Sequence, residues 1–394
     1  MWLEEVLLGR EGRRCNVRRS PLQREKVRIV QHIYETVANR EDARIPMGRM
    51  KGPGIFLAQF LRDKEPYNNL SSIGRWAAGL GYKGIQIPAW DSRAIDLNLA
   101  AQSKTYCDEY KGRLREMRLE PTELAGYLAG QVLAVHPAYE LMFEAFHPPG
   151  LKGRERTEWA AGELRKCIAG STNLGTDVIP VLSGGFAWHM VYPWPQRPEG
   201  IIQEAFLELA KRWRPLLDLA LDRGIVFAFE LHPGSDVFDG ATYEMFLDYT
   251  DVHPAACLNY DPSHFLLQQL DYLEFIRLYG KRIKGFHVKD AEFHPTGRVG
   301  VYGGYQSWNR RAGRFRSLGD GQVDFTRVFT LLTEAGYGGC AVLEWECCIK
   351  SPEQGAAEGA PFIEKHLVDV TDVVFDDFAG KTDAARNRQI LGFE

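Results

Sequence analysis

No stretch of the sequence reaches the roughly 20 consecutive apolar residues that a membrane-spanning helix requires, and the first residues lack the apolar core of a secretion signal. We therefore expect a cytoplasmic protein with no membrane partner. The seven cysteines show no CxxC or zinc-ribbon spacing, and their odd number prevents complete pairing. This pattern is typical of a reduced protein with buried thiols rather than of a disulfide framework.

An excess of positive charge is also missing. The formal net charge is -4 and the pI is about 6.2, whereas a dedicated nucleic-acid-binding domain usually carries a basic face. Neither a P-loop nor a GxGxxG fingerprint occurs, so no phosphate-binding loop is indicated. We expect no nucleic-acid partner.

The chain has 394 residues, 45% of them hydrophobic, which is enough for one large core. Residues 1–50 are rich in arginine and are interpreted as an N-terminal extension without a function of its own. We expect a catalytic domain over residues 51–365. Residues 366–394 are expected to form a C-terminal helix and tail.

Eight apolar runs of strand length alternate with longer segments of helical pattern, which predicts a parallel sheet covered by helices. The runs are residues 54–60, 83–90, 119–127, 177–183, 225–231, 255–260, 283–288 and 340–345. Eight such units favour an α/β fold of the (β/α)8 TIM-barrel type. Long insertions follow the third and seventh runs, at residues 131–153 and 291–322, and predict long loops at the catalytic, C-terminal face.

Four acidic or imidazole side chains fall at the ends of the last four predicted strands. They are Glu230, Asp261, His287 and Glu344. Because neighbouring barrel strands end on the same rim, we expect these side chains to line one arc. Three carboxylates and an imidazole form a hard oxygen and nitrogen ligand set, which suits one divalent ion of Mn, Mg, Co or Zn. Glu346 points the same way as Glu344 under strand alternation and is a rival ligand.

These segments resemble the xylose-isomerase-like TIM-barrel superfamily, which includes sugar phosphate isomerases and epimerases. The matching pieces are FELHPG, the D-x-x-H of residues 261–264, the HVKD of residues 287–290 and the LEWE of residues 343–346. The resemblance implies that the four residues bind the metal and that Glu230 and Glu344 exchange a proton on opposite faces of the substrate. It also implies that His264 contacts substrate oxygens. One departure is the segment DAEFHP, where ketose 3-epimerases carry an arginine.

The ligand set and the resemblance together predict a sugar isomerase or epimerase that removes a proton beside a carbonyl held by the metal, through an enediolate. A lyase that eliminates the aglycone from a 3-keto-glycoside is the alternative. An endonuclease IV-type repair enzyme and a non-catalytic sugar-binding barrel are further alternatives. The expected partner is a small sugar or keto-sugar, and a homo-oligomer or a small partner subunit is left open.

Further side chains near the ends of predicted strands are candidate substrate-binding residues. They are His232, His136, Lys289, Trp90 and Trp188, together with His264. The tryptophans offer flat surfaces for a sugar ring, and His136 is the candidate base of the lyase alternative. The arginines of residues 310–316 are expected either to close over an anionic substrate or to pair with acidic groups of a neighbouring subunit.

Overall fold

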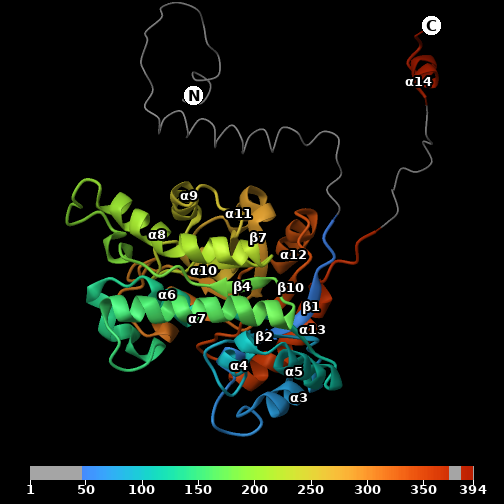
Figure 1. Cartoon of the computed structure of the whole chain (residues 1–394). Helices are drawn as coiled ribbons and strands as arrows, with labels where there is room; N and C mark the ends of the chain where they lie inside the picture. Colours follow the sequence, from blue (N-terminus) through green and yellow to red (C-terminus); the bar gives the residue numbers. More distant parts are fainter. Residues whose placement is uncertain (1–46, 372–382, 394) are drawn as a thin grey trace, which may run out of the picture. The chain divides into compact units, whose positions relative to one another are not determined.

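The computed structural model describes residues 47–371 and 383–393 (Figure 1). The N-terminal extension predicted for residues 1–50 therefore lies outside the described residues, apart from its last four. Within the predicted C-terminal helix and tail, residues 372–382 and 394 lie outside them as well, and the rest is described. Within the described ranges, no helix combines the length and the apolarity needed to cross a membrane.

Eight parallel strands form a nearly closed barrel, which confirms the predicted fold class. The strands are β1 (Lys51–Phe56), β2 (Gly84–Pro88), β3 (Glu120–Ala125), β4 (Val178–Val181), β5 (Val226–Glu230), β6 (Ala256–Tyr260), β7 (Ile283–Val288) and β10 (Cys340–Leu343). Their hydrogen-bonded order is β3-β2-β1-β10-β7-β6-β5-β4. Each strand lies within one of the eight apolar runs or extends it by a few residues, because parallel strands covered on both sides are apolar along their whole length.

Apart from α14, near the end of the described residues, the helices follow successive strands and pack outside the barrel (Figure 1). They are α3 (Leu70–Gly79), α4 (Leu97–Gln102), α5 (Lys104–Glu116), α6 (Tyr127–Leu133), α7 (Gly153–Leu174), α8 (Ile201–Asp222), α9 (Gly240–Tyr249), α10 (Pro262–Gln268), α11 (Tyr272–Tyr279), α12 (Phe325–Glu334), α13 (Pro352–His366) and α14 (Ala384–Ile390). Short 3-10 turns are η2 (Leu57–Gln59), η3 (Pro137–Phe146), η4 (Trp188–Met190), η5 (Gly280–Arg282) and η6 (Trp308–Arg310).

Glycines terminate four of these helices. Gly175 is the C-cap of α7 and has a φ of 79°. Gly81, Gly224 and Gly336 stand just beyond the C-caps of α3, α8 and α12, with φ values of 99°, 68° and 83°. Only glycine adopts this left-handed conformation without steric cost, and the chain then turns into the next strand.

The barrel has one weak seam, between β3 and β4. The strand ladder is continuous everywhere else, whereas these two strands are not hydrogen-bonded neighbours. Each carries a proline, Pro121 in β3 and Pro180 in β4, and proline has no N–H to donate to a ladder. The Gly126 N–H crosses the seam just past β3, donating to the Pro180 carbonyl over 2.9 Å.

The insertion after β7 contains an antiparallel hairpin that the sequence analysis did not predict. Its strands are β8 (Asp290–Phe293) and β9 (Gly313–Arg316). The Asp290 carboxylate anchors it by accepting backbone N–H bonds from Ala291, Gly319, Gly321 and Val323 at 2.8–3.2 Å. A side chain at Gly321 would collide with this carboxylate, since an added Cβ would lie 2.1 Å from Asp290 Oδ1.

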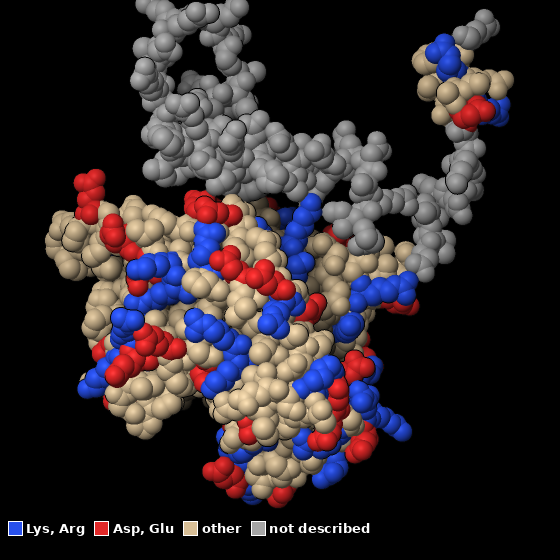
Figure 2. Space-filling model, in the orientation of Figure 1, with Lys and Arg blue, Asp and Glu red and all other residues tan. Residues whose placement is uncertain are grey.

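Two arginines of the cluster at residues 310–316 pair inside this hairpin. Arg314 and Arg316 both bind the buried Glu292 carboxylate, the latter over 2.6 Å. Arg311 lies over the Trp308 ring, 5.0 Å from its centroid. Figure 2 shows positive and negative side chains interspersed over the visible face of the described residues. The absence of a nucleic-acid partner stays a prediction.

Candidate metal centre

Four consecutive strands of the ladder, β5, β6, β7 and β10, bring the predicted ligands to one rim of the barrel. Glu230 ends β5, His287 stands one residue before the end of β7, and Glu344 directly follows β10. Asp261 follows β6 and is also the N-cap of α10. One ligand atom from each residue lies within 4.8 Å of those of the other three. All four residues are buried, so the sequence correctly predicted their convergence.

His287 is oriented as a metal-binding imidazole. Its Nδ1 lies 3.0 Å from both Glu230 Oε2 and Glu344 Oε2. Its Nε2 lies 3.0 Å from the Gln86 amide oxygen, and the Gln86 amide in turn donates to Glu123 over 3.3 Å. A ligating histidine characteristically donates its other ring N–H to a carbonyl or carboxylate. A cation bound at Nδ1 would require the tautomer in which Nε2 carries the proton and donates it to Gln86.

Asp261 carries the clearest sign that a cation fits here. Its Oδ1 accepts the Ser263 N–H over 2.8 Å, whereas its buried Oδ2 accepts no hydrogen bond. Burial raises the pKa of this carboxyl to about 8. The Lys289 ammonium lies 3.7 Å from Oδ2, beyond hydrogen-bond distance. A buried acceptor without a hydrogen bond is costly, and a divalent ion held with the other three ligands would satisfy it.

Other polar side chains hold the two glutamates in place. Tyr127 and Asn259 donate to Glu230 Oε2 over 3.0 Å and 2.9 Å. Gln59 donates to Glu344 Oε1 over 3.1 Å, and the buried Lys289 ammonium lies 3.1 Å from Glu344 Oε2. Burial alone would raise the pKa of Glu344, but Lys289 and His287 together lower that pKa to about 2. The carboxylate is therefore held ionised.

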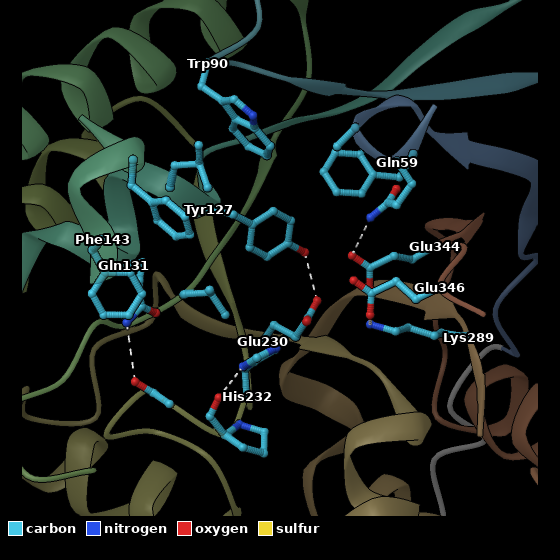
Figure 3. Close-up of a pocket in the computed structure, with 17 residues that line it drawn as sticks. Gln59, Trp90, Tyr127, Gln131, Phe143, Glu230, His232, Lys289, Glu344 and Glu346 are labelled. Atoms are coloured by element: carbon cyan, nitrogen blue, oxygen red, sulfur yellow. Dashed lines mark hydrogen bonds and ion pairs between the residues drawn. The ribbon is translucent and has the colours of Figure 1, made fainter. Parts of the chain in front are cut away.

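A cavity of about 290 Å³ opens onto this centre (Figure 3). Its lining residues are Phe56, Ala58, Gln59, Trp90, Tyr127, Leu128, Gln131, Phe143, Phe146, Leu182, Glu230, His232, Pro233, Gly234, Lys289, Glu344 and Glu346. Figure 3 shows Glu344, Glu346 and Lys289 on one side and Phe143 on the other. The cavity thus places charged groups opposite an aromatic wall that includes Phe143, as small-molecule sites commonly do.

The other predicted residues divide into two groups. His232, Lys289 and Trp90 line the cavity, and the buried His264 lies beside it, with Nε2 3.3 Å from Glu230 Oε1. His136 and Trp188 do not line it.

These two residues have neighbours in the loops instead. The His136 ring lies 3.9 Å from that of His189, and the Trp188 ring lies 5.1 Å from that of Phe238. Glu346, the rival ligand, binds the Lys289 ammonium over 2.7 Å, whereas Glu344 belongs to the buried group of four.

Sequence reasoning missed the polar residues that surround the ligands. Gln86 and Asn259 lie inside strands that are otherwise largely apolar, in GIQIP and ACLNY. Tyr127 begins α6 directly after the third strand. A buried amide in an apolar strand needs a hydrogen-bond partner. An amide in such a strand was therefore the sequence signal that a polar site lies nearby.

Comparisons with known proteins agree with this architecture. The sequence model of a family described as xylose isomerase-like TIM barrel matches residues 75–366. An inosose dehydratase of Bacillus velezensis is 29% identical over 153 residues, which are 38% of this chain and 51% of that protein. The chain therefore spans about half the length of this relative.

Solved structures share the fold at low identity. A 3-keto-D-glucoside 4-epimerase from E. coli superimposes with a TM-score of 0.54 and 14% identity, covering 81% of this chain and 99% of that one. A xylose isomerase-like TIM barrel protein from Mycobacterium smegmatis in complex with magnesium gives 0.51 and 16%, covering 75% and 87%.

Proposed function

The chain belongs to the xylose isomerase-like TIM barrel family, and on that premise we propose that it is a divalent-metal-dependent sugar isomerase or epimerase. Its substrate would be a small sugar or keto-sugar. The observation that carries this proposal is the buried group of Glu230, Asp261, His287 and Glu344, whose ligand atoms lie within 4.8 Å of one another. Three buried carboxylates so close together repel unless a cation is shared among them.

The two glutamates are the groups that would move the proton. A bound divalent ion would supply a Lewis acid that polarises the substrate carbonyl and acidifies the neighbouring C–H. Glu230 and Glu344 enter from β5 and β10, the two ends of the four-strand arc. One carboxylate can remove a proton from carbon, and the other can return it to the opposite face. Return to the same carbon gives epimerisation, and return to its neighbour gives isomerisation.

The surrounding residues would orient the groups that react. Tyr127 and Asn259 fix Glu230 Oε2, while Lys289 keeps Glu344 ionised. The aromatic wall would exclude water and hold the apolar face of a sugar ring. Water exclusion strengthens the electrostatic interactions inside the cavity.

A lyase is the second candidate, because a curated relative is named as a dehydratase. The same first step, proton removal beside a carbonyl, leads to elimination when a leaving group stands on the next carbon. His232 lines the cavity and could protonate such a leaving group. The two functions differ in product, since only elimination releases water or an aglycone.

Metal analysis and solvent-deuterium exchange test the proposal. The purified protein is expected to contain a divalent ion and to exchange one carbon-bound proton of its substrate, observed by NMR over a panel of free sugars, 3-oxidised sugars and inososes. Exchange without loss of a group supports the isomerase or epimerase. Exchange with release of water or aglycone supports the lyase.

Glutamine variants assign the carboxylates. Glu230→Gln and Glu344→Gln are each expected to abolish the exchange, because the amide cannot accept the proton. The matched control is Glu334→Gln, on the exposed end of α12, which should exchange at the wild-type rate. Normal exchange in both site variants would remove the glutamates from the mechanism.

A further inference from the structure

The segment that follows the last barrel strand, β10, carries two cysteines in a row, Cys347 and Cys348. Both are half-buried, whereas the other cysteines in the described part of the chain are buried, namely Cys107, Cys167, Cys257 and Cys340. We propose that Cys347 and Cys348 form a redox-active dithiol, in which a peroxide oxidises Cys347 and Cys348 then closes a disulfide. This inference goes beyond the proposed function and does not depend on it, because it concerns thiol chemistry outside the four-residue centre.

The Cys347 sulfur lies among hydrogen-bond donors. It accepts the Lys350 backbone N–H over 3.4 Å, across the bend that residues 348–350 form. Burial alone would raise the pKa of this thiol, but hydrogen bonds from the Lys350 and Ile349 N–H groups and from Ser317 lower it. Donors directed at a sulfur stabilise its thiolate, which is the form that attacks an oxidant.

A guanidinium adds positive charge beside the same sulfur. Burial alone would lower the pKa of Arg316, but the Glu292 carboxylate and the Cys347 sulfur raise it. Arg316 also pairs with Glu292 over 2.6 Å, so its charge is shared between the carboxylate and the sulfur. A neighbouring cation is a common feature of reactive thiols.

Cys348 has different surroundings, which suit the second step. Its Sγ lies 3.8 Å from the Phe315 carbonyl oxygen, to which the thiol can donate. Burial raises the pKa of Cys348, and a carbonyl acceptor also favours the protonated form. Phe315 lies in β9 and Ser317 directly follows that strand, so the two sulfurs contact the same stretch of the hairpin. One thiol is therefore prepared to attack, and the other stands beside it to react second.

The reaction balances with hydrogen peroxide as the oxidant. The Cys347 thiolate attacks one peroxide oxygen, the O–O bond breaks and hydroxide leaves, which gives a sulfenic acid. The Cys348 sulfur then attacks the Cys347 sulfur, the S–O bond breaks and a second hydroxide leaves. The two hydroxides take up the two thiol protons. Two thiols and one peroxide thus give one disulfide and two water molecules.

A disulfide between adjacent residues is easily reduced again. Consecutive Cα atoms are about 3.8 Å apart, whereas the Cα atoms of an ordinary disulfide are about 4.4–6.8 Å apart. The ring is therefore strained, and strained disulfides have higher reduction potentials than structural ones. We expect a small thiol to reverse the oxidation.

The dithiol adjoins the acidic side of the cavity. Cys347 directly follows Glu346, which lines the cavity together with Glu344 (Figure 3). The Ser317 hydroxyl, which hydrogen-bonds to Cys347, also accepts the Trp345 indole N–H over 3.1 Å. Ring closure at Cys347 would therefore replace a contact that holds this segment against the β8–β9 hairpin.

Mass spectrometry of the full-length protein tests the proposal. Reduced protein, freed of reductant, is treated with a slight excess of hydrogen peroxide, alkylated and cleaved after glutamate. Cleavage after Glu346 and Glu353 releases residues 347–353, which contain only these two cysteines. We expect this peptide to have lost two hydrogen atoms and to have escaped alkylation. Treatment with dithiothreitol before alkylation should restore both thiols.

Single variants assign the two steps. Cys348→Ser should stop at the sulfenic acid, which dimedone traps on Cys347, and Cys347→Ser should leave Cys348 reduced at the same peroxide dose. Cys107→Ala, which removes a buried thiol of α5, is the control and should form the disulfide as the wild type does.

Iodoacetamide compares the two thiols directly at neutral pH. The thiolate fraction changes about tenfold for each unit of pKa. Cys347 in the Cys348→Ser protein should therefore react about tenfold faster, or more, than Cys348 in the Cys347→Ser protein. A wild-type peptide that stays a dithiol after peroxide, or equal alkylation rates for the two thiols, would overturn the inference. Neither result affects the proposed function, which fails only if the four-residue centre binds no ion.

Discussion

Replacement of Gln86 by leucine should weaken metal binding, although Gln86 offers no ligand to the four-residue centre. Its amide oxygen lies 3.0 Å from His287 Nε2, and it would accept the Nε2 proton of the tautomer whose Nδ1 binds a cation. Loss of such a supporting partner typically costs 10–100-fold in metal affinity, or about 1.4–2.8 kcal/mol. The imidazole N–H would also stay buried without an acceptor, which costs about 1–3 kcal/mol of stability.

Competition against a fluorescent chelator would measure the affinity for Mn²⁺, and thermal denaturation of the metal-free protein would measure stability separately. Glu123→Gln is the matched control, because its amide oxygen can still accept from Gln86 and the contact to His287 remains. We expect this control to bind within a few-fold of wild type. A Gln86→Leu protein that folds and binds Mn²⁺ with wild-type affinity would refute the role of Gln86 in orienting His287.

Two further predictions concern stability. Removal of the metal from the four-residue centre by a chelator should lower the melting temperature by ~4 °C. An ion at 100 times its Kd contributes ~2.7 kcal/mol to the free energy of unfolding, and a barrel of this size has a large unfolding entropy. An unchanged melting curve in calorimetry would contradict a bound ion. Asp290→Asn should cost ~2–4 kcal/mol in urea unfolding, because an amide cannot accept from all four backbone N–H groups that bind this carboxylate. Asp108→Asn, on the surface of α5, is its control and should leave the urea midpoint unchanged, whereas equal midpoints for both variants would contradict the anchoring role.

The sequence was sufficient to predict the barrel and the convergence of the four candidate ligands. Most strands were predictable because they lie in largely apolar runs, although Thr122 and Glu123 interrupt β3. The helix ends were predictable because glycines follow them. Convergence followed from topology alone, since parallel strands of a barrel end on one rim. No side-chain contact had to be known to place Glu230 near Glu344.

The sequence was insufficient for short elements and for contacts between distant segments. Helices α4 and α10 have only 6 and 7 residues, too few for a periodic pattern to stand out. The β8 strand starts two residues after β7 ends, so the sequence analysis included it in the long loop after β7. The link from His287 through Gln86 to Glu123 joins β7, β2 and β3, and no local pattern in the sequence reveals such a link.

The seam between β3 and β4 lies apart from the strands that carry the four candidate ligands. The four ligands stand on β5, β6, β7 and β10, where the ladder is unbroken. The aromatic wall, including Phe143 and Phe146, belongs to the insertion between β3 and β4. Insertions or deletions at this seam would therefore reshape one side of the cavity, while the strands that carry the four candidate ligands keep their register. Protein engineers who want to change the shape of the cavity could therefore vary residues 134–153 first.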